Sequence, residues 1–270
     1  MIKSIRSIAG ACALTIAITG CHDNAALAET STTSSASPSP STLAPQSPET
    51  ADTMNVIGGD RRGAATSWSE YLRSVDEEDR KFLEDISSRY YGAVQFGNAR
   101  EREELSRLGI PLPGEWLSSR DHSDEELAKL GDAGDAKALI FLTDRLIAKM
   151  SDTRSKAGES SYLSYVKSLP DDMRSPGQQD LAEASGRASA SYIISPKPFT
   201  AYQYGIATAE VTGSPDIVPA SIAIAGELGD ARAENILASY YKTGPRSDDA
   251  AVLQAEEAMR QMSRSALDRK

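Results

Sequence analysis

The amino-acid sequence predicts an all-α fold for residues 66–270, built from helical hairpins in a short solenoid-like array or an irregular bundle, after a disordered N-terminal tether. Apolar residues recur in this part of the chain at i, i+3, i+4 and i+7, the spacing of one helix face. Runs that alternate apolar and polar residues, as half-buried strands do, are few. The phrase Gly-Asp-Ala-basic-Ala also occurs twice, from Gly134 and from Gly229, which indicates a repeated helical turn.

The first predicted helices begin directly after the tether. Their apolar faces are formed by Trp68, Tyr71, Leu72 and Val75, and then by Phe82, Leu83, Ile86 and Tyr90. Ser74 and Glu77 have the spacing of a capping box, which predicts that the second helix begins there. A third, short helix is predicted to end at Gly109, because glycine adopts the left-handed conformation easily and two prolines follow. Ser123 and Glu126 form a second capping box, which opens the next helix.

The remaining helices are predicted from the same periodicity. They cover residues 135–150, 158–168, 178–191, 199–211, 216–228, 230–242 and 247–267. The loops between them are predicted to contain Pro170, Pro176, Pro196, Pro198, Gly213 and Pro215. Proline and glycine are the residues that most often interrupt a helical pattern.

Each copy of the repeated phrase predicts a helix that ends at a glycine and a new helix that begins at the aspartate. Asp135 and Asp230 would accept hydrogen bonds from free backbone N–H groups as N-caps. The alanines on either side of the basic residue are small enough to let a neighbouring helix approach closely. The first copy opens a helix with apolar residues on two sides, so we expect that helix to be covered on both.

The segment around the second copy, AIAGELGDARAENILASYYKTGPRSDDAAVLQAEEAM, resembles a Sel-one-like repeat, a relative of the tetratricopeptide repeat. The matching residues are Ala225, Gly229, Asp230, Ala233, Leu237, Tyr241 and Gly244, with Ala250, Ala255 and Ala258 in the second helix. The first copy matches only the turn and one helix. The two copies lie 95 residues apart, and this distance is not a multiple of the repeat length of about 34–40 residues. Two helical hairpins in an ordinary bundle therefore remain an alternative. The resemblance implies a protein-binding scaffold rather than a catalyst.

The first twenty residues have the features of a secretory signal, with Lys3 and Arg6 before an apolar run of about 11 residues. Such a run is too short to span a membrane, which takes about 20 residues. The run ends in ITGC, residues 18–21, which resembles the lipobox of bacterial lipoproteins. The alternative is an ordinary secretory signal with a chance cysteine.

The lipoprotein resemblance implies that residues 1–20 are removed and that Cys21 carries fatty acids such as palmitate. The chain would then be held in the bacterial cell envelope by its lipid. In lipoproteins of double-membraned bacteria, Asp directly after the cysteine favours the inner membrane. Because His22 stands there, we expect the outer membrane, with the domain facing the periplasm.

Residues 21–65 form the predicted tether. They are rich in Ser, Thr, Ala and Pro and contain few large aliphatic residues. Such a segment cannot bury enough apolar surface to offset the entropy of ordering its backbone. A flexible chain of about 45 residues would give the helical domain a reach of about 40 Å.

Charge and cysteine content exclude several classes of function. The formal net charge is −10, and removal of Lys3 and Arg6 with the signal would make it −12. Nucleic acid is therefore not an expected partner, because its phosphates attract clustered Lys and Arg. The two cysteines are Cys12, in the signal, and Cys21. The mature domain would have no thiol for a disulfide, a metal site or nucleophilic catalysis.

No catalytic or cofactor-binding pattern is convincing in the folded region. Ser164 and Lys167 fit Ser-x-x-Lys, and residues 242–244 fit Lys-Thr-Gly, but penicillin-recognising enzymes place the latter on a sheet edge. His122 is the single histidine after residue 22, and we expect it on the surface beside an N-cap. A carboxylate pair for glycoside cleavage cannot be singled out among 39 acidic residues. No cofactor or metal is expected.

One segment, residues 189–205, combines aromatic side chains with a proline-stiffened loop. Its candidate partner-binding residues are Tyr192, Lys197, Phe199, Tyr202 and Tyr204. Rigid aromatic side chains are common at the centres of protein interfaces. The alternative is that Phe199 and Tyr202 pack the following helix onto the core.

Together these patterns predict a lipid-anchored envelope protein that acts as a protein-binding helical scaffold, with an unidentified partner. The alternative function is an envelope hydrolase that acts on peptidoglycan through a carboxylate pair. A deep cleft with two convergent carboxylates would favour the hydrolase, and a broad groove without them would favour the scaffold.

Overall fold

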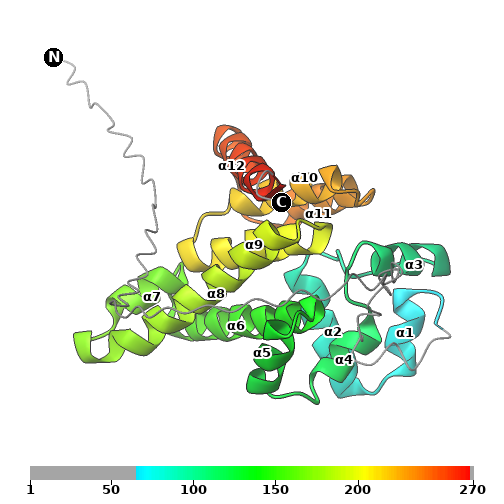
Figure 1. Ribbon diagram of the computed structural model, residues 1–270, viewed down its shortest axis with the longest axis horizontal. Coiled ribbons are helices and arrows are strands. Elements are labelled where there is room, and N and C mark those ends of the chain that lie inside the picture. The colour runs from blue at the N-terminus through cyan, green and yellow to red at the C-terminus, as the bar shows by residue number, and fades with distance from the viewer. Residues whose placement is uncertain (1–64, 268–270) are drawn as a thin grey trace, which may run out of the picture. The chain divides into compact units, whose positions relative to one another are not determined.

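The computed structural model describes residues 65–267, and this part of the chain is all-α without a strand, as predicted (Figure 1). Its elements are α1 (Trp68–Ser74), α2 (Glu77–Arg89), α3 (Ala99–Arg107), α4 (Pro113–Ser119), α5 (Asp124–Asp132), α6 (Ala136–Ala157), α7 (Tyr162–Ser168), the 3-10 helix η1 (Asp171–Met173), α8 (Arg174–Ile194), α9 (Pro198–Thr212), α10 (Ile217–Glu227), α11 (Ala233–Thr243) and α12 (Asp249–Leu267). The predicted signal, the lipobox and the predicted tether up to residue 64 lie outside the described residues. None of the described helices has the length and apolar character needed to cross a membrane.

The N-cap of α2 differs from the prediction. Asp76, not Ser74, caps this helix, and its carboxylate accepts a hydrogen bond of 2.9 Å from the N–H of Asp79. Ser74 is the last residue of α1, where its hydroxyl donates to the Tyr71 carbonyl. The capping box predicted at the start of α5 is present, with Ser123 and Glu126 in the expected roles. Ser123 and Ser74 were predicted from the same pattern, but only Ser123 lies next to the free N–H groups of a helix start.

Three prolines lie in the first turn of a helix, and two of them were predicted to lie in loops. Pro113 is the first residue of α4, which was not predicted, and Pro198 is the first residue of α9. Pro176 lies in the first turn of α8. The N–H groups of a first helical turn have no partner within the helix, so a proline there loses no hydrogen bond. The prediction that Pro176 and Pro198 lie in loops is therefore wrong.

The two copies of the repeated phrase form the same helix end. At the end of α5, Gly134 has φ 100°, and the N–H of Asp135 donates to the Leu130 carbonyl at 2.9 Å. At the end of α10, Gly229 has φ 107°, and the N–H of Asp230 donates to the Ala225 carbonyl at 3.0 Å. This pairing is the Schellman motif, which needs a left-handed residue and so favours glycine.

The aspartates of the two copies then take different roles. Asp135 is the N-cap of α6 and accepts from the N–H groups of Lys137 and Ala138, as predicted. Helix α11 begins only at Ala233, after one further turn, with Arg232 at the cap position. Asp230 accepts a hydrogen bond of 3.0 Å from the backbone N–H of Arg232, but it is not the N-cap of α11 as predicted, because the helix begins later and side chains also bind its carboxylate.

Close helix contact at these turns comes from glycine as much as from alanine. Ala138 and Ala233 are buried as expected, but the first alanine of each copy is exposed. A Cβ added at Gly131 would lie 2.3 Å from Cδ2 of Leu139, and one at Gly226 would lie 3.0 Å from the Ala233 Cβ. At both turns, the residue that faces the following helix is therefore a glycine: Gly131 in α5 faces α6, and Gly226 in α10 faces α11.

Helix α6 is the inner helix of the fold, as its two apolar stripes predict. It packs against α5, α7, α8 and α9 (Figure 1). Its buried residues are Ala138, Ile140, Phe141, Leu142, Thr143, Asp144, Leu146, Ile147 and Met150. Helix α12 packs on α10 and α8, where the Tyr192 hydroxyl donates to the Met259 carbonyl at 3.1 Å. In a regular tandem array each unit contacts only its neighbours, so this return to α8 is a feature of a bundle.

Candidate functional site

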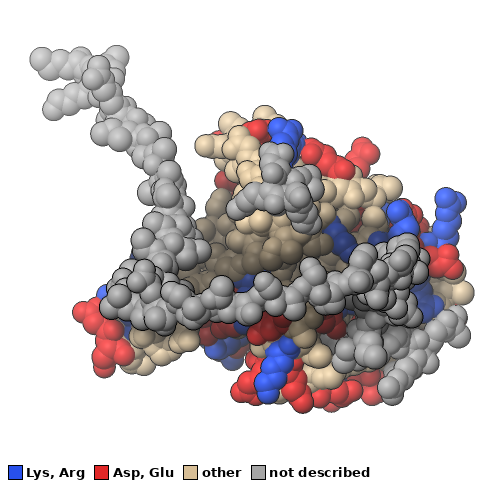
Figure 2. All heavy atoms as spheres, viewed as in Figure 1, with Lys and Arg blue, Asp and Glu red and all other residues tan. Residues whose placement is uncertain are grey.

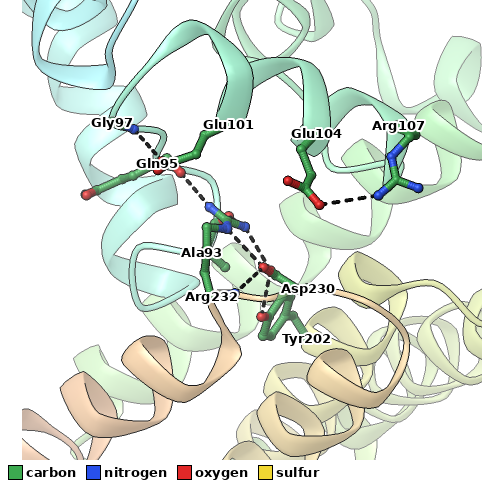
Figure 3. A network of polar contacts seen from close by, with 9 residues as sticks. All are labelled: Ala93, Gln95, Gly97, Glu101, Glu104, Arg107, Tyr202, Asp230 and Arg232. Carbon is green, nitrogen blue, oxygen red and sulfur yellow. Dashed lines mark hydrogen bonds and ion pairs between the residues drawn. The ribbon is translucent and has the colours of Figure 1, made fainter.

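The second copy of the turn forms a polar clasp (Figure 3). Asp230 is 1% exposed and accepts hydrogen bonds from the Arg232 guanidinium at 2.8 and 2.9 Å and from the Tyr202 hydroxyl at 3.0 Å. The same guanidinium donates to the carbonyl of Gln95 at 2.6 Å and to that of Ala93 at 2.9 Å. Three parts of the chain, the turn before α11, helix α9 and the segment after α2, are thereby joined.

The protonation of Tyr202 suits this arrangement. Burial and the negative charge of Asp230 raise the pKa of the Tyr202 phenol well above its usual value, so the hydroxyl keeps its proton and acts as donor. Two acids of the neighbouring helix α3 are also engaged (Figure 3): Glu101 accepts from the N–H of Gly97 at 2.7 Å, and Glu104 pairs with Arg107 at 3.3 Å. We therefore interpret the clasp as a structural fastening.

The first copy of the turn borders an open groove of about 590 Å³. One wall is the α5–α6 turn from Gly131 to Ile140, and the opposite wall is the end of α8 with the start of α9. Gly109, in the turn between α3 and α4, completes the lining. The volume lies within the range of ligand-binding clefts in proteins, and Ile194 at the edge is 68% exposed.

Lys197 crosses this groove at the start of α9. Its side chain passes Gly109, where an added Cβ would lie 3.0 Å from the lysine Cδ. Gly109 itself has φ 76°, so glycine is favoured there for backbone and space alike. Lys197 is exposed, and its amine forms no ion pair with a described carboxylate. Because long lysine side chains cover apolar surface with their methylenes, this residue presents both an apolar stem and a free positive charge.

The polar groups of the first turn differ from those of the clasp. Lys137, which corresponds to Arg232, pairs with the buried Glu115 on α4. Oδ2 of Asp135 is shielded from water and has no hydrogen-bond partner among the described residues. In the second copy, Tyr202 donates to the equivalent oxygen. The sequence repeats, but the partners do not.

Most of the aromatic residues singled out in the sequence lie inside the protein. Tyr192, Phe199 and Tyr202 are at most 2% exposed, and Tyr204 is half-buried and stacks on Tyr192 with ring centres 5.6 Å apart. Lys197 alone of these five residues lies exposed, in the groove. In this structure the three buried side chains are not available to a partner, which fits the alternative of core packing. Cys21 lies outside the described residues.

Carboxylates with altered acidity lie away from the groove. Burial raises the pKa of Asp144, against the opposing charge of Arg89, whose guanidinium lies 2.6 Å away. This pair is in the core of the bundle and contacts no described pocket. Within residues 65–267 no group of three or more His, Cys, Asp or Glu side chains is placed to hold a metal ion.

The weak sequence motifs also find structural explanations. Ser164 lies on α7, where its hydroxyl accepts from that of Ser161 at 3.0 Å, and Lys242 lies near the end of α11. The described chain offers no sheet edge for a penicillin-recognising site. His122 lies half-buried in the turn before α5.

No known protein family, characterised protein or solved structure matches this chain. The resemblances to lipoproteins and to Sel-one-like repeats therefore stay predictions. The groove itself was missed in the sequence. Its signal was the Gly-x-x-Gly-Asp pattern before α6, in which Gly131 and Gly134 leave the turn without side chains.

Proposed function

We propose that the chain is a lipid-anchored protein of the bacterial cell envelope that acts as a protein-binding helical scaffold. The observation that carries the binding role is the groove at the α5–α6 turn, which has a mostly apolar lining and no pair of convergent carboxylates. Binding sites for proteins and peptides combine apolar surface with a few placed polar groups. A hydrolase would need its acid and base on the same cleft.

The lipid anchor is proposed from the signal-like N-terminus and the ITGC motif. More than one acyl chain is needed for stable membrane attachment, at about 0.8 kcal/mol per buried methylene. A tether of about 45 residues would let the groove meet partners at some distance from the membrane. Orientation toward the periplasm at the outer membrane is part of this proposal.

Fatty-acid labelling in cells tests the anchor. We expect an alkyne-labelled palmitate analogue to be incorporated into the full chain and into the Cys12→Ser variant, but not into Cys21→Ser. On fractionation, the Cys21→Ser chain should leave the lipid-anchored membrane fraction. Equal labelling of wild type and Cys21→Ser would overturn the anchor.

Two further experiments, one with the purified chain and one in cells, separate the scaffold function from the hydrolase function. We expect the purified full chain to leave isolated peptidoglycan undigested and to form a covalent adduct with one envelope protein after in-cell crosslinking. Release of muropeptides by the chain, without a protein adduct, would instead favour the hydrolase.

A further inference from the structure

We propose that the groove between the α5–α6 turn and the α8–α9 loop binds a short acidic segment of a partner polypeptide. An apolar side chain of that segment lies in the groove, and a neighbouring carboxylate pairs with Lys197. The inference rests on the proposed scaffold function and names the chemistry of its ligand.

The second copy of the turn shows what this local structure can hold. There, the basic residue of the turn binds two backbone carbonyls of a short segment, Ala93–Gln95, from a distant part of the chain. The aspartate receives the Tyr202 hydroxyl. The turn thus binds a piece of polypeptide through backbone and side-chain groups together.

The first copy has the same turn, but part of its binding capacity is unused. Lys137 stands at the position of Arg232 in the clasp, and like that arginine it is already engaged, here by Glu115. Oδ2 of Asp135 has no partner, and the hydroxyls of Ser191 and Ser195 in the opposite wall form no hydrogen bond with a described residue. Peptide N–H and C=O groups would supply partners for the Ser191 and Ser195 hydroxyls in that wall.

The apolar part of the ligand is set by the floor and edge of the groove. Leu139 and Ile140 line it from α6, and Ile194 stands at its edge with most of its surface in water. A single exposed aliphatic residue needs no explanation. Here it continues an apolar groove of about 590 Å³, and contiguous apolar surface is typical of interaction sites.

The acidic part of the ligand is set by short-range charge. Asp135 and two lysines are the charged residues that line the groove. The Asp135 carboxylate is bound to N–H groups at the α6 N-terminus, which offset its charge, and Lys137 is paired. This leaves the Lys197 amine as the unpaired charge. Acidic and basic side chains are interspersed on the face shown in Figure 2. Since salt screens charges beyond about 8–10 Å, Lys197 rather than the net charge decides which ligand is attracted.

Fluorescence anisotropy with two matched peptide pools tests this inference on the full chain. Both pools are labelled dodecapeptides with Leu, Ile, Phe or Tyr at the centre; one carries Asp or Glu beside it, and the other carries Lys. We expect the acidic pool to bind at least tenfold more tightly than the basic pool. Lys197→Glu should abolish this preference, whereas Lys242→Glu, at an exposed lysine near the end of α11, should leave it unchanged.

A second pair of variants tests the apolar contact. Ile194→Ser should weaken binding of the acidic pool about tenfold, whereas Leu253→Ser, at a residue of α12 that is 64% exposed, should not. Circular dichroism of all four variants checks that the helices are intact. Equal binding of both pools, or an acidic preference that survives Lys197→Glu, would overturn the inference. If an envelope protein still crosslinks to the chain in that case, the scaffold function stands and only its ligand is misassigned.

Discussion

Replacement of Arg232 by Met is expected to lower the free energy of unfolding by about 3–5 kcal/mol, the usual cost of breaking one side of a buried ion pair. Asp230 is 1% exposed and would keep only the Tyr202 hydroxyl and a backbone N–H as donors. The carbonyls of Ala93 and Gln95 would lose their shared partner as well. Urea denaturation followed by circular dichroism measures the change.

Arg107→Met is the matched control for this prediction. Its ion pair with Glu104 is also drawn in Figure 3, but the Arg107 side chain is 71% exposed. Exposed pairs contribute at most about 1 kcal/mol, so the loss should be small. The double variant Asp230→Asn with Arg232→Met should recover part of the stability, because it removes the uncompensated charge. If Arg232→Met cost no more than Arg107→Met, the clasp would not fasten the fold.

Gly205→Ala is expected to destabilise the protein by about 3 kcal/mol or more, at the upper end of overpacking effects. Helix α9 packs closely on α10 at this point. The new Cβ would lie 2.1 Å from Oγ and 2.4 Å from Cβ of Ser221, and 3.1 Å from the carbonyl oxygen of Ile217. Since Ser221 is fully buried and the carbonyl belongs to the backbone, the two helices must separate to make room.

Gly186→Ala, at another helical glycine, is expected to stabilise the protein rather than destabilise it. Gly186 lies in α8, and an added Cβ would meet no atom within 4 Å. Alanine should therefore stabilise the protein by about 0.5–1 kcal/mol through helix propensity alone. Thermal unfolding of both variants checks the pair. A similar shift in Tm for the two glycines would contradict the close contact of α9 with α10.

Local sequence patterns predicted most helices because apolar periodicity and glycine ends are local properties. The extra helix at Pro113 was missed because a proline both ends one helix and begins another. Whether Ser74 or Asp76 caps α2 could not be decided from spacing, since both are good cap residues. Which of the two lies next to the free N–H groups of the first turn of α2 depends on the packing of the whole chain.

The candidate site was predicted less well, for a physical reason. Aromatic residues suit an interface and a core equally, and only the packing of distant helices buries Phe199 against Tyr90 and Trp116. The repeated phrase predicted the two turns, but their different roles depend on long-range partners. Arg232 reaches Gln95 across 137 residues of chain. No local pattern encodes such a contact.

Site-specific photo-crosslinking in cells is the most direct test of the scaffold proposal. A photoreactive amino acid replaces either Ile194, at the edge of the groove, or Leu253, on α12, in the full chain. Both residues are similarly exposed, at 68% and 64%. We expect one envelope protein to crosslink in stoichiometric yield from position 194 and not from position 253, through an acidic segment that mass spectrometry can map. Equal adducts from both positions, no adduct from position 194, or only adducts between two copies of the chain would contradict the proposal.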